Sequence, residues 1–529
     1  MTQKHKPTAE QELVIGSMGS SESIMVEALA GTAKTTTLEM SAPQIKVPAL
    51  ALAFNKKIAT EMQGRFPQNF SVKTLNALGH MAWARALPAG TRLVLDDRKL
   101  GKLVSQVAKD RKIDLHGDQW DALRRLVTAG MQAGLVPNEL GPAGFVPDDL
   151  ATWIDIGDQI GILPDETEFL LDLARDILRQ SIDLAKRGTI SFDDQIYCSV
   201  MLGGVFPQFP VVFVDEAQDL SPLNHEMLRL VLRPAGKLVA VGDEKQAIYA
   251  FRGASGDSLD RIRKLKPKWA TLGLKTTFRC PKVIVERQQG HAPGYVAWPS
   301  NPDGRVIQLQ GPRPKQNDLD DPNEGQEPYE WGWEDIQGAM PWPRASIAIL
   351  CRNNGPLFSM AMKLLRKQIG VTMLGRDIGK GLMALTRKLA PQDELPADLV
   401  MGKIREWEET ESSRAIAGGH EERVAGIVDR AECLYAIIEG AGCRDAGELR
   451  TVLEKLFASQ SGQVTLGSIH RSKGLEFDLV VHLDPWRIPS RWAKKSADPV
   501  ALRQEYNLKY VCETRTRHTL VLANVEDFR

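Results

Sequence analysis

The chain has 529 residues, with 67 Lys and Arg against 67 Asp and Glu, so its formal net charge is zero. A hydrophobic content of 43% and a charged content of 25% are ordinary for a globular protein, and they exclude a disordered, collagen-like or disulfide-scaffold chain. The length predicts three or four domains. The neutral charge argues mildly against nucleic acid as a partner, because nucleic-acid-binding domains are usually basic.

The first part of the chain alternates expected strands and helices. Residues 23–27 are expected to form a short buried strand, and a loop of small residues leads into a helix that begins at Lys34. A second strand is expected at residues 47–54 and a second helix at 55–65. This βαβ order predicts a parallel sheet with both faces covered.

From about residue 83 to residue 188 the pattern becomes helical. Residues 165–186 are expected to form one helix, and its spacing places five apolar side chains on one face: Phe169, Leu170, Leu173, Ile177 and Leu184. Strand patterns return at residues 211–214 and 237–241. The helical region is therefore interpreted as an insertion into the first α/β unit.

A second α/β unit is expected to begin near Thr271. Its strands are expected at residues 306–310, 346–350 and 479–483. Residues 318–335 contain eight acidic residues and no Lys or Arg, which predicts a solvated loop. Residues 380–459 are again helical and charge-rich, as in a second insertion.

The segment ALAGTAKT at residues 28–35 follows a strand and opens a helix, as a phosphate-binding loop does. In such a loop, backbone N–H groups meet the phosphates, Lys34 neutralises their charge and the Thr35 hydroxyl coordinates Mg²⁺. Ala33 stands where the pattern has glycine. An ordinary strand–turn–helix junction is therefore an equally good reading of this loop when it is considered by itself.

A second pattern supports the nucleotide reading. The apolar strand VVFV at residues 211–214 is followed by Asp215 and Glu216, at the strand end where ligands bind in open α/β sheets. Asp215 can hold Mg²⁺, and Glu216 can orient and polarise the attacking water. The two patterns together favour ATP hydrolysis.

With these motifs and several others, the chain resembles a superfamily 1 helicase of the UvrD/Rep type. The resembling segments extend from residue 7 to residue 522, and the most distinctive is GDEKQAIYAFRGA at residues 242–254. The others are PTAEQ at 7–11, DEAQD at 215–219, TFRC at 277–280, HRSKGLEF at 470–477 and YVCETR at 510–515.

The resemblance implies a set of nucleotide-handling residues. It makes Gln11 the reader of adenine, Gln246 the sensor of the γ-phosphate, and Arg279 and Arg515 two arginine fingers. Phe278 replaces the usual adenine-stacking tyrosine, and Glu476 would meet the ribose. The cradle for ATP and Mg²⁺ comprises Ala30, Gly31, Thr32, Ala33, Lys34, Thr35 and Thr36, with Thr35 and Asp215 on the metal.

It also implies an architecture, in which two RecA-like domains each carry a helical insertion and close on ATP. We expect the first RecA-like domain at residues 1–85 and 190–270 and its insertion at 86–189. The second is expected at residues 271–379 and 460–529, with a short insertion at 380–459.

The DNA track is expected to combine stacking aromatic side chains with polar and basic groups. The resemblance and the residue types indicate Phe54, Asn55, His80, Phe192, Tyr249, Phe251, Arg252 and His470. Two further basic clusters, at residues 261–268 and 486–495, would either line a DNA groove or form a solvated helix face and a packed loop.

The expected function is that of an ATP- and Mg²⁺-dependent DNA helicase or translocase. It is expected to move 3′→5′ on single-stranded DNA and to unwind duplex DNA at junctions between single and double strands. The expected setting is replication, repair or recombination. The alternatives are a nucleic-acid-binding protein whose nucleotide site does not hydrolyse and, less in keeping with the motifs, a P-loop enzyme acting on a small molecule. The sequence shows no membrane-length apolar run, signal peptide or cysteine framework, so we expect a cytoplasmic protein, in a nucleoid-associated or viral-replication setting. We expect no membrane partner. Replication or repair proteins are expected as partners, but the sequence does not identify them. Because residues 318–335 hold eight of the negative charges, the rest of the chain has a surplus of eight positive charges, and neutral overall charge fits a confined DNA track.

Overall fold

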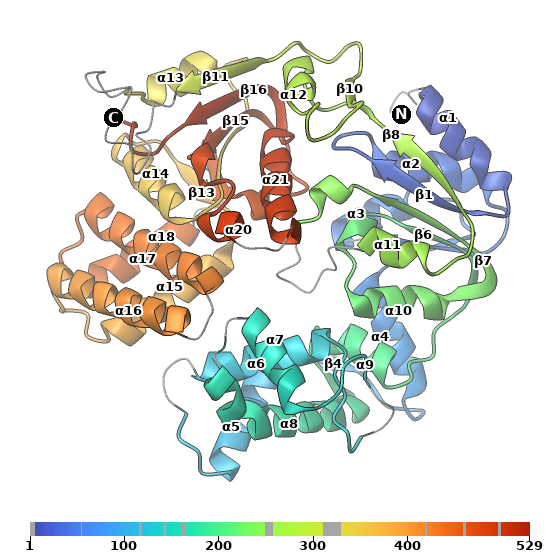
Figure 1. Cartoon of the computed structure of the whole chain (residues 1–529), viewed down its shortest axis with the longest axis horizontal. Coiled ribbons are helices and arrows are strands. Elements are labelled where there is room, and N and C mark those ends of the chain that lie inside the picture. Colours follow the sequence, from blue (N-terminus) through green and yellow to red (C-terminus); the bar gives the residue numbers. More distant parts are fainter. Residues whose placement is uncertain are drawn as a thin grey trace. The chain divides into compact units, whose positions relative to one another are not determined.

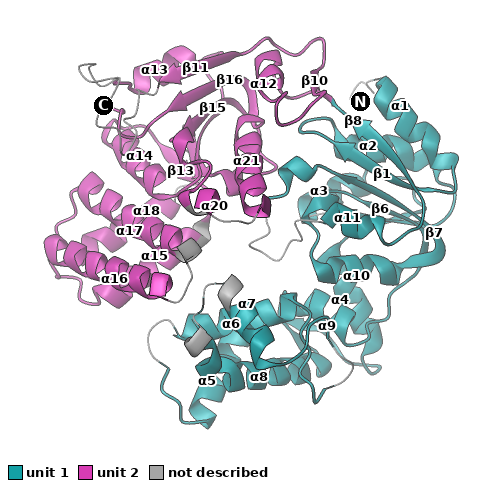
Figure 2. Ribbon diagram, in the orientation of Figure 1, with its two compact units in different colours: residues 1–275 teal, residues 276–529 magenta. Residues whose placement is uncertain are grey.

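The computed structural model describes residues 6–53, 55–115, 119–140, 144–160, 162, 164–248, 258–309, 330–417, 421–458, 462–495 and 499–529. The chain divides into two compact units, Met1–Lys275 and Thr276–Arg529 (Figure 2). Each unit contains a six-stranded sheet in which all neighbouring strands are parallel. The predicted fold class, two RecA-like α/β domains, is confirmed.

The sheet of unit 1 has the strand order β3-β2-β6-β7-β1-β8 (Figure 1). Its strands are β1 (Ser23–Ala28), β2 (Ala49–Ala53), β3 (Phe70–Thr74), β6 (Phe209–Val214), β7 (Leu232–Gly242) and β8 (Trp269–Leu274). Helix α1 (Ala9–Gly16) precedes the first strand, and the helices that connect the strands include α2 (Lys34–Ser41), α3 (Lys56–Gln63), α4 (Leu75–Ala86), α10 (Pro222–Val231) and α11 (Ser258–Arg263).

Both faces of this sheet are buried, which is why its strands are apolar runs rather than alternating patterns. Every residue of β2 is buried. Along β6, Val211 and Phe213 belong to the core on one face, and Val212 and Val214 belong to the core on the other. Because β6, β7 and β1 are neighbours, the segments that follow their carboxyl ends lie at one edge of the sheet.

The region between α4 and β6 has a hydrophobic core of its own. It comprises β4 (Val94–Leu95), α5 (Lys99–Asp110), α6 (Gln119–Gln132), α7 (Leu150–Gln159), α8 (Pro164–Lys186), β5 (Thr189–Ile190) and α9 (Asp194–Met201). The buried ion pair between Lys99 and Asp194, 2.7 Å from Nζ to Oδ2, ties α5 to α9 inside it.

The sheet of unit 2 has the strand order β11-β16-β15-β12-β14-β13 (Figure 1). Its strands are β11 (Arg305–Leu309), β12 (Ile347–Cys351), β13 (Val371–Met373), β14 (Val464–Ser468), β15 (Phe477–Leu483) and β16 (Thr516–Ala523), and a small separate sheet pairs β9 (Thr276–Thr277) with β10 (Val296–Ala297). Helices α12 (Lys282–Arg287), α13 (Trp333–Ala339), α14 (Gly355–Arg366), α19 (Ile469–Ser472), α20 (Arg491–Lys495) and α21 (Pro499–Glu513) accompany this sheet.

Four further helices form the second helical region: α15 (Arg376–Leu389), α16 (Ala397–Ala417), α17 (Glu421–Ala441) and α18 (Ala446–Ala458). Unlike the first helical region, they share one hydrophobic core with the sheet, since Leu434 and Leu453 pack in the same cluster as Ile349 and Phe358. The bounds of the two predicted insertions stay a prediction, because the two compact units do not separate the insertions from the sheets.

Three expectations require correction. The second unit does not begin near Thr271, because β8 pairs with β1 and completes the first sheet. Phe169 is 53% exposed and does not share the buried face of α8. The last part of the acidic segment, residues 331–335, is not a solvated loop, because Trp331 is fully buried and α13 begins at Trp333. Residues 318–329 lie outside the described part of the chain.

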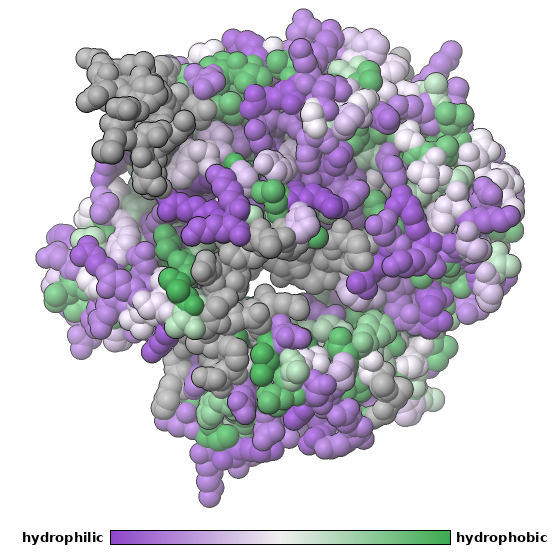
Figure 3. Space-filling view, in the orientation of Figure 1, coloured by the Kyte–Doolittle hydropathy of each residue, from purple (hydrophilic) through white to green (hydrophobic). Residues whose placement is uncertain are grey.

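Over the face seen in Figure 3, hydrophilic side chains predominate and apolar ones are scattered among them. In the part of the chain that the structure describes, no helix combines the length and the apolar character that crossing a bilayer requires.

Candidate functional site

The loop after β1 has a strained backbone that presents the start of α2. Gly31 has φ +70°, and Ala33, the residue before the helix, is left-handed at φ +60° and ψ +46°. Ala30 and Thr32 are buried, and the Thr32 hydroxyl donates to the Leu29 carbonyl at 2.8 Å, which fixes the turn. Because alanine has no side chain with which to cap a helix, the first N–H groups of α2 are left for an anion such as a phosphate.

Two carboxylates follow β6 at the same edge of the sheet. Asp215 is 3% exposed and accepts a short hydrogen bond from the Thr35 hydroxyl. Burial and the adjacent Glu216 raise the pKa of Asp215 to about 6. Glu216 is itself left-handed at φ +50°, and its Oε1 lies 3.6 Å from Lys34 Nζ. Strained backbone of this kind persists where the surrounding structure fixes it, and it is often found at functional sites.

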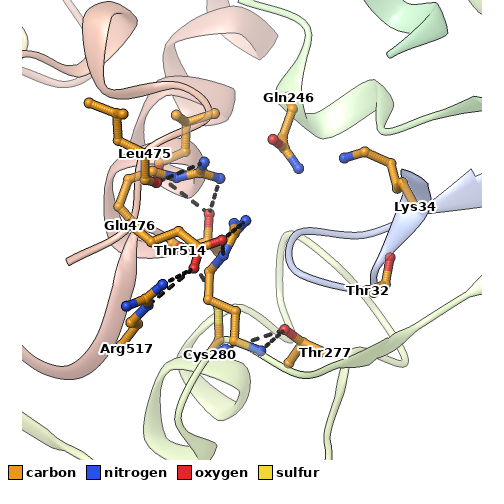
Figure 4. Close-up of polar contacts among 12 residues, drawn as sticks. Thr32, Lys34, Gln246, Thr277, Cys280, Leu475, Glu476, Thr514 and Arg517 are labelled. Atoms are coloured by element: carbon orange, nitrogen blue, oxygen red, sulfur yellow. Dashed lines mark hydrogen bonds and ion pairs between the residues drawn. The ribbon is translucent and has the colours of Figure 1, made fainter. Parts of the chain in front are cut away.

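A chain of hydrogen bonds continues from Glu216 to the segment after β7. Gln218 donates to Glu216 Oε2 at 2.6 Å and accepts from the backbone N–H of Asp243 at 3.0 Å. Gln246 in turn donates to Asp243 Oδ2 at 2.6 Å. Burial raises the pKa of Asp243, although the nearby Lys34 acts to lower it. In Figure 4 the polar ends of Lys34 and Gln246 converge.

Gln218 and Asp243 are site residues that the sequence reasoning did not select. The signal was available, since Asp243 directly follows β7, Gln218 lies in the short turn after β6, and both belong to the quoted motifs. What the sequence could not supply was the adjacency of β6 and β7, which brings these residues together across 25 positions of chain.

Gln11 is buried near the start of α2. Its amide donates to the Thr37 hydroxyl at 3.0 Å and its Oε1 accepts from the backbone N–H of Thr8, so it completes the capping box of α1. Thr36 is half-buried on the first turn of α2. The adenine-reading role of Gln11 stays a prediction.

Unit 2 contains the two predicted arginine fingers. Arg279 contacts Glu476, with Nε 2.6 Å from Oε1, and Arg517 contacts the other oxygen of Glu476 at 2.8 Å (Figure 4). Burial, the largest single influence, lowers the pKa of Arg279, but the charge and the hydrogen bond of Glu476, with further contributions from Cys280 and Tyr295, together raise that pKa overall. Burial also acts against ionisation of Glu476, yet the two arginines hold the pKa of Glu476 below its usual value.

Arg515 is 1% exposed, and its guanidinium donates to the carbonyls of Val511 at 3.0 Å and Leu475 at 3.4 Å. Burial, and then the positive charge of Arg279, lower the pKa of Arg515 to about 10. Phe278 is 40% exposed, and its ring lies 5.2 Å from that of Trp298. Unit 2 therefore holds two cations close together, and a phosphoryl group would relieve the repulsion between them.

The predicted DNA residues divide into three groups. Phe54, Tyr249, Phe251 and Arg252 lie outside the described residues. Asn55 is exposed and caps α3, His80 and His470 are half-buried, and His80 Nδ1 lies 3.5 Å from the Gln195 amide.

Phe192 is 57% exposed, as a base-stacking residue has to be. Asn76, on α4, donates to the Phe192 carbonyl at 3.1 Å and so holds the segment that carries this ring.

The two basic clusters are partly engaged within the protein. Arg263 pairs with Glu27 and with Asp260, and the Lys266 ammonium donates to the Pro234 carbonyl. In the second cluster, Arg487 pairs with Asp484 at 3.0 Å and lies over the ring of Trp486. These contacts favour structural roles for Arg263, Lys266 and Arg487 over DNA contacts.

Comparison with known proteins finds two segments that match helicase domains. The UvrD/REP helicase N-terminal domain matches residues 183–267, and the UvrD-like helicase C-terminal domain matches residues 408–527. These two segments of the chain are therefore similar to UvrD/Rep-type helicase domains. Among its UvrD/Rep-type relatives, F-box DNA helicase protein 1 of Schizosaccharomyces pombe is 23% identical over 97% of this chain and 57% of its own length. F-box DNA helicase 1 of Gallus gallus is 24% identical over 98% of this chain and 49% of its own length.

DNA helicase II of Escherichia coli is 29% identical over 28% of this chain and 20% of its own length. The chain thus spans about half the length of the two relatives that match almost all of it.

Proposed function

We propose that this protein is an ATP-dependent DNA helicase or translocase that moves 3′→5′ along single-stranded DNA and unwinds duplex at its junctions. The observation that carries the proposal is the continuous contact chain in unit 1 that runs from Lys34 through Glu216, Gln218 and Asp243 to Gln246. Such a chain can transmit the state of a bound nucleotide to the segment that begins after β7. The direction of movement is taken from the family resemblance.

The residues present fit ATP and Mg²⁺. Asp215 is a buried carboxylate that accepts a hydrogen bond from the Thr35 hydroxyl, so oxygen ligands of the kind that Mg²⁺ prefers lie together here. Thr35 and Asp215 would hold Mg²⁺, which supplies neutralisation of phosphate charge and orientation of the phosphates. The loop at residues 29–33 and the N-terminus of α2 would hold the phosphates, with Lys34 beside them.

In the hydrolysis that we propose, Glu216 orients the attacking water and takes a proton from it. The left-handed backbone of Glu216 and its bond from Gln218 fix the direction of its carboxylate. Arg279 and Arg515 stabilise the negative charge of the transferring phosphoryl group, a contribution of about 10³–10⁵ in rate for an arginine finger. On the DNA side, the exposed ring of Phe192 stacks on a base.

The test is steady-state ATP hydrolysis with and without single-stranded DNA, in wild type, Lys34→Ala and the control Lys46→Ala. Lys46 is exposed, and its ammonium contacts only the Pro43 carbonyl among the described residues. We expect DNA to stimulate turnover in wild type and in Lys46→Ala, and Lys34→Ala to abolish it. Intact DNA binding with no turnover in any of the three proteins would instead support the non-hydrolysing alternative.

A further inference from the structure

A polar cavity of about 270 Å³ lies in unit 2, lined by residues of α12, of the turn after it and of α21. Arg287 and His291 reach it from the end of α12 and the turn that follows, and Tyr506, Lys509 and Glu513 reach it from α21. None of these residues belongs to the nucleotide site or to the DNA track described above. The volume of the cavity is close to the lower limit of small-ligand pockets, so it is too small for a duplex.

The acidic residue of the cavity is already neutralised. Glu513 is fully buried, and its two oxygens accept from Arg287 Nε at 2.8 Å and Nη2 at 3.2 Å. Gln288 adds a third hydrogen bond, at 2.5 Å. A guanidinium has five N–H donors, so this bidentate pair leaves most of the donor capacity of Arg287 for another acceptor.

Lys509 supplies a positive charge that the protein does not balance. It is half-buried, and within the described residues its ammonium makes neither an ion pair nor a hydrogen bond. Tyr506 lies three residues earlier on α21, on the same side of the helix, and is 45% exposed. A cation beside an exposed aromatic ring is the combination that binds a nucleotide of a single strand, through its phosphate and its base.

A buried histidine lies beneath α21. The side chains of Val481 and Leu483 on β15 belong to the core on one face of the sheet, so His482 between them points to the other face, against which α21 packs. His482 is fully buried, and within the described part of the chain neither of its ring nitrogens has a hydrogen-bond partner. Burial, Lys509 and Arg287 together lower the pKa of His482 to about 3. The positive field of the two cations thus extends into the protein, and an anion in the cavity would offset it.

We propose that the cavity beside α12 and α21 binds the phosphate of a nucleotide, with Lys509 and Arg287 on the phosphate and the ring of Tyr506 against the base. The nucleotide is either one unit of a DNA strand or a free mononucleotide, since both offer the same phosphate and base. In the first case this inference rests on the proposed function and adds a binding subsite to the DNA track.

The experiment compares Lys509→Ala and Tyr506→Ala with wild type and with the control Lys403→Ala, which removes an exposed lysine from α16 in the same unit. Binding of a fluorescein-labelled oligothymidylate is measured by anisotropy over a range of salt concentrations. In Lys509→Ala we expect several-fold weaker binding and a slope of log K against log salt that is shallower by about 0.7, the value for one phosphate of a single strand. Tyr506→Ala should weaken binding about tenfold through lost stacking.

Calorimetric titration with thymidine monophosphate distinguishes the two sources of the phosphate. Weaker oligonucleotide binding in both variants assigns the cavity to a DNA strand, and weaker monophosphate binding alone assigns it to a free nucleotide. If both variants bind both probes as Lys403→Ala does, the proposal is overturned. Neither readout uses ATP hydrolysis, so failure of the proposed motor would appear separately, in the Lys34→Ala comparison.

Discussion

Replacing Ala33 with glycine tests whether the nucleotide loop is strained by its alanine. Ala33 has φ +60° and ψ +46°, a left-handed conformation that its Cβ disfavours. Glycine adopts this conformation without the steric penalty. Because Ala33 is the residue immediately before Lys34, Ala33→Gly changes the backbone preference and leaves every proposed contact side chain in place.

The expected magnitude follows from that one dihedral angle. A left-handed residue other than glycine costs about 1–2 kcal/mol, and the greater freedom of glycine in the unfolded chain returns about 0.5–1 kcal/mol of this. The net gain is therefore about 0–1.5 kcal/mol, and its upper limit corresponds to about 3–6 °C in the melting temperature of a unit of this size. Since the loop conformation itself does not change, ATP turnover should be retained or raised.

The assay is thermal unfolding followed by circular dichroism, with ATP hydrolysis measured on the same samples. The control is Ala59→Gly, inside helix α3, where glycine should destabilise by about 1 kcal/mol. The two substitutions should thus shift the melting temperature in opposite directions. If Ala33→Gly lowers it as Ala59→Gly does, or abolishes turnover, the methyl group of Ala33 is a necessary part of the loop and the reasoning from strain is wrong.

Four other substitutions address the network, the arginine finger, the first sheet and the DNA track. Gln218→Leu should lower kcat for ATP about 10–100-fold with little change in KM, because it loosens Glu216 without touching the phosphate loop. Arg279→Lys should lower kcat at least 100-fold, since lysine keeps the positive charge but lacks the planar guanidinium that can donate two parallel hydrogen bonds. The kcat of the control Arg517→Lys should stay within a few-fold of the wild-type value. Lys237→Met removes hydrogen bonds to the carbonyls of Ser17, Met18 and Ser20, so urea unfolding should show a loss of about 2 kcal/mol with nucleotide binding intact. Phe192→Ala should reduce the stimulation by single-stranded DNA without reducing basal turnover, and Phe169→Ala, which removes another exposed phenylalanine of the same helical region, should change neither.

Buried strands and the segments that follow them were the predictable part of the fold. A run such as residues 211–214 is apolar because both faces of the sheet are covered, and the structure places it in β6. The sequence does not say which sheet a strand joins, and so β8 was assigned to the second unit although its partner is β1. Likewise, periodicity places Phe169 within one turn of the buried Leu173, but only the packed neighbours of α8 decide that its ring is exposed.

The candidate site was predictable where its residues are adjacent in sequence. Lys34 and Thr35 follow one strand and Asp215 and Glu216 follow another, and parallel pairing brings the two pairs to one edge. The bonds of Gln218 depend on three-dimensional adjacency and on the left-handed turn at Glu216, and no spacing in the sequence encodes either.

The most direct test of the central claim is strand separation by Glu216→Gln. A partial duplex with a 3′ single-stranded tail is mixed with wild type or with this variant, and release of the labelled strand is followed in the presence of ATP. We predict that wild type separates the strands only with ATP, and that Glu216→Gln binds ATP and the tailed DNA but releases no strand. Strand release by Glu216→Gln at the wild-type rate would contradict the assignment of Glu216 as the group that activates water, and with it the proposed motor.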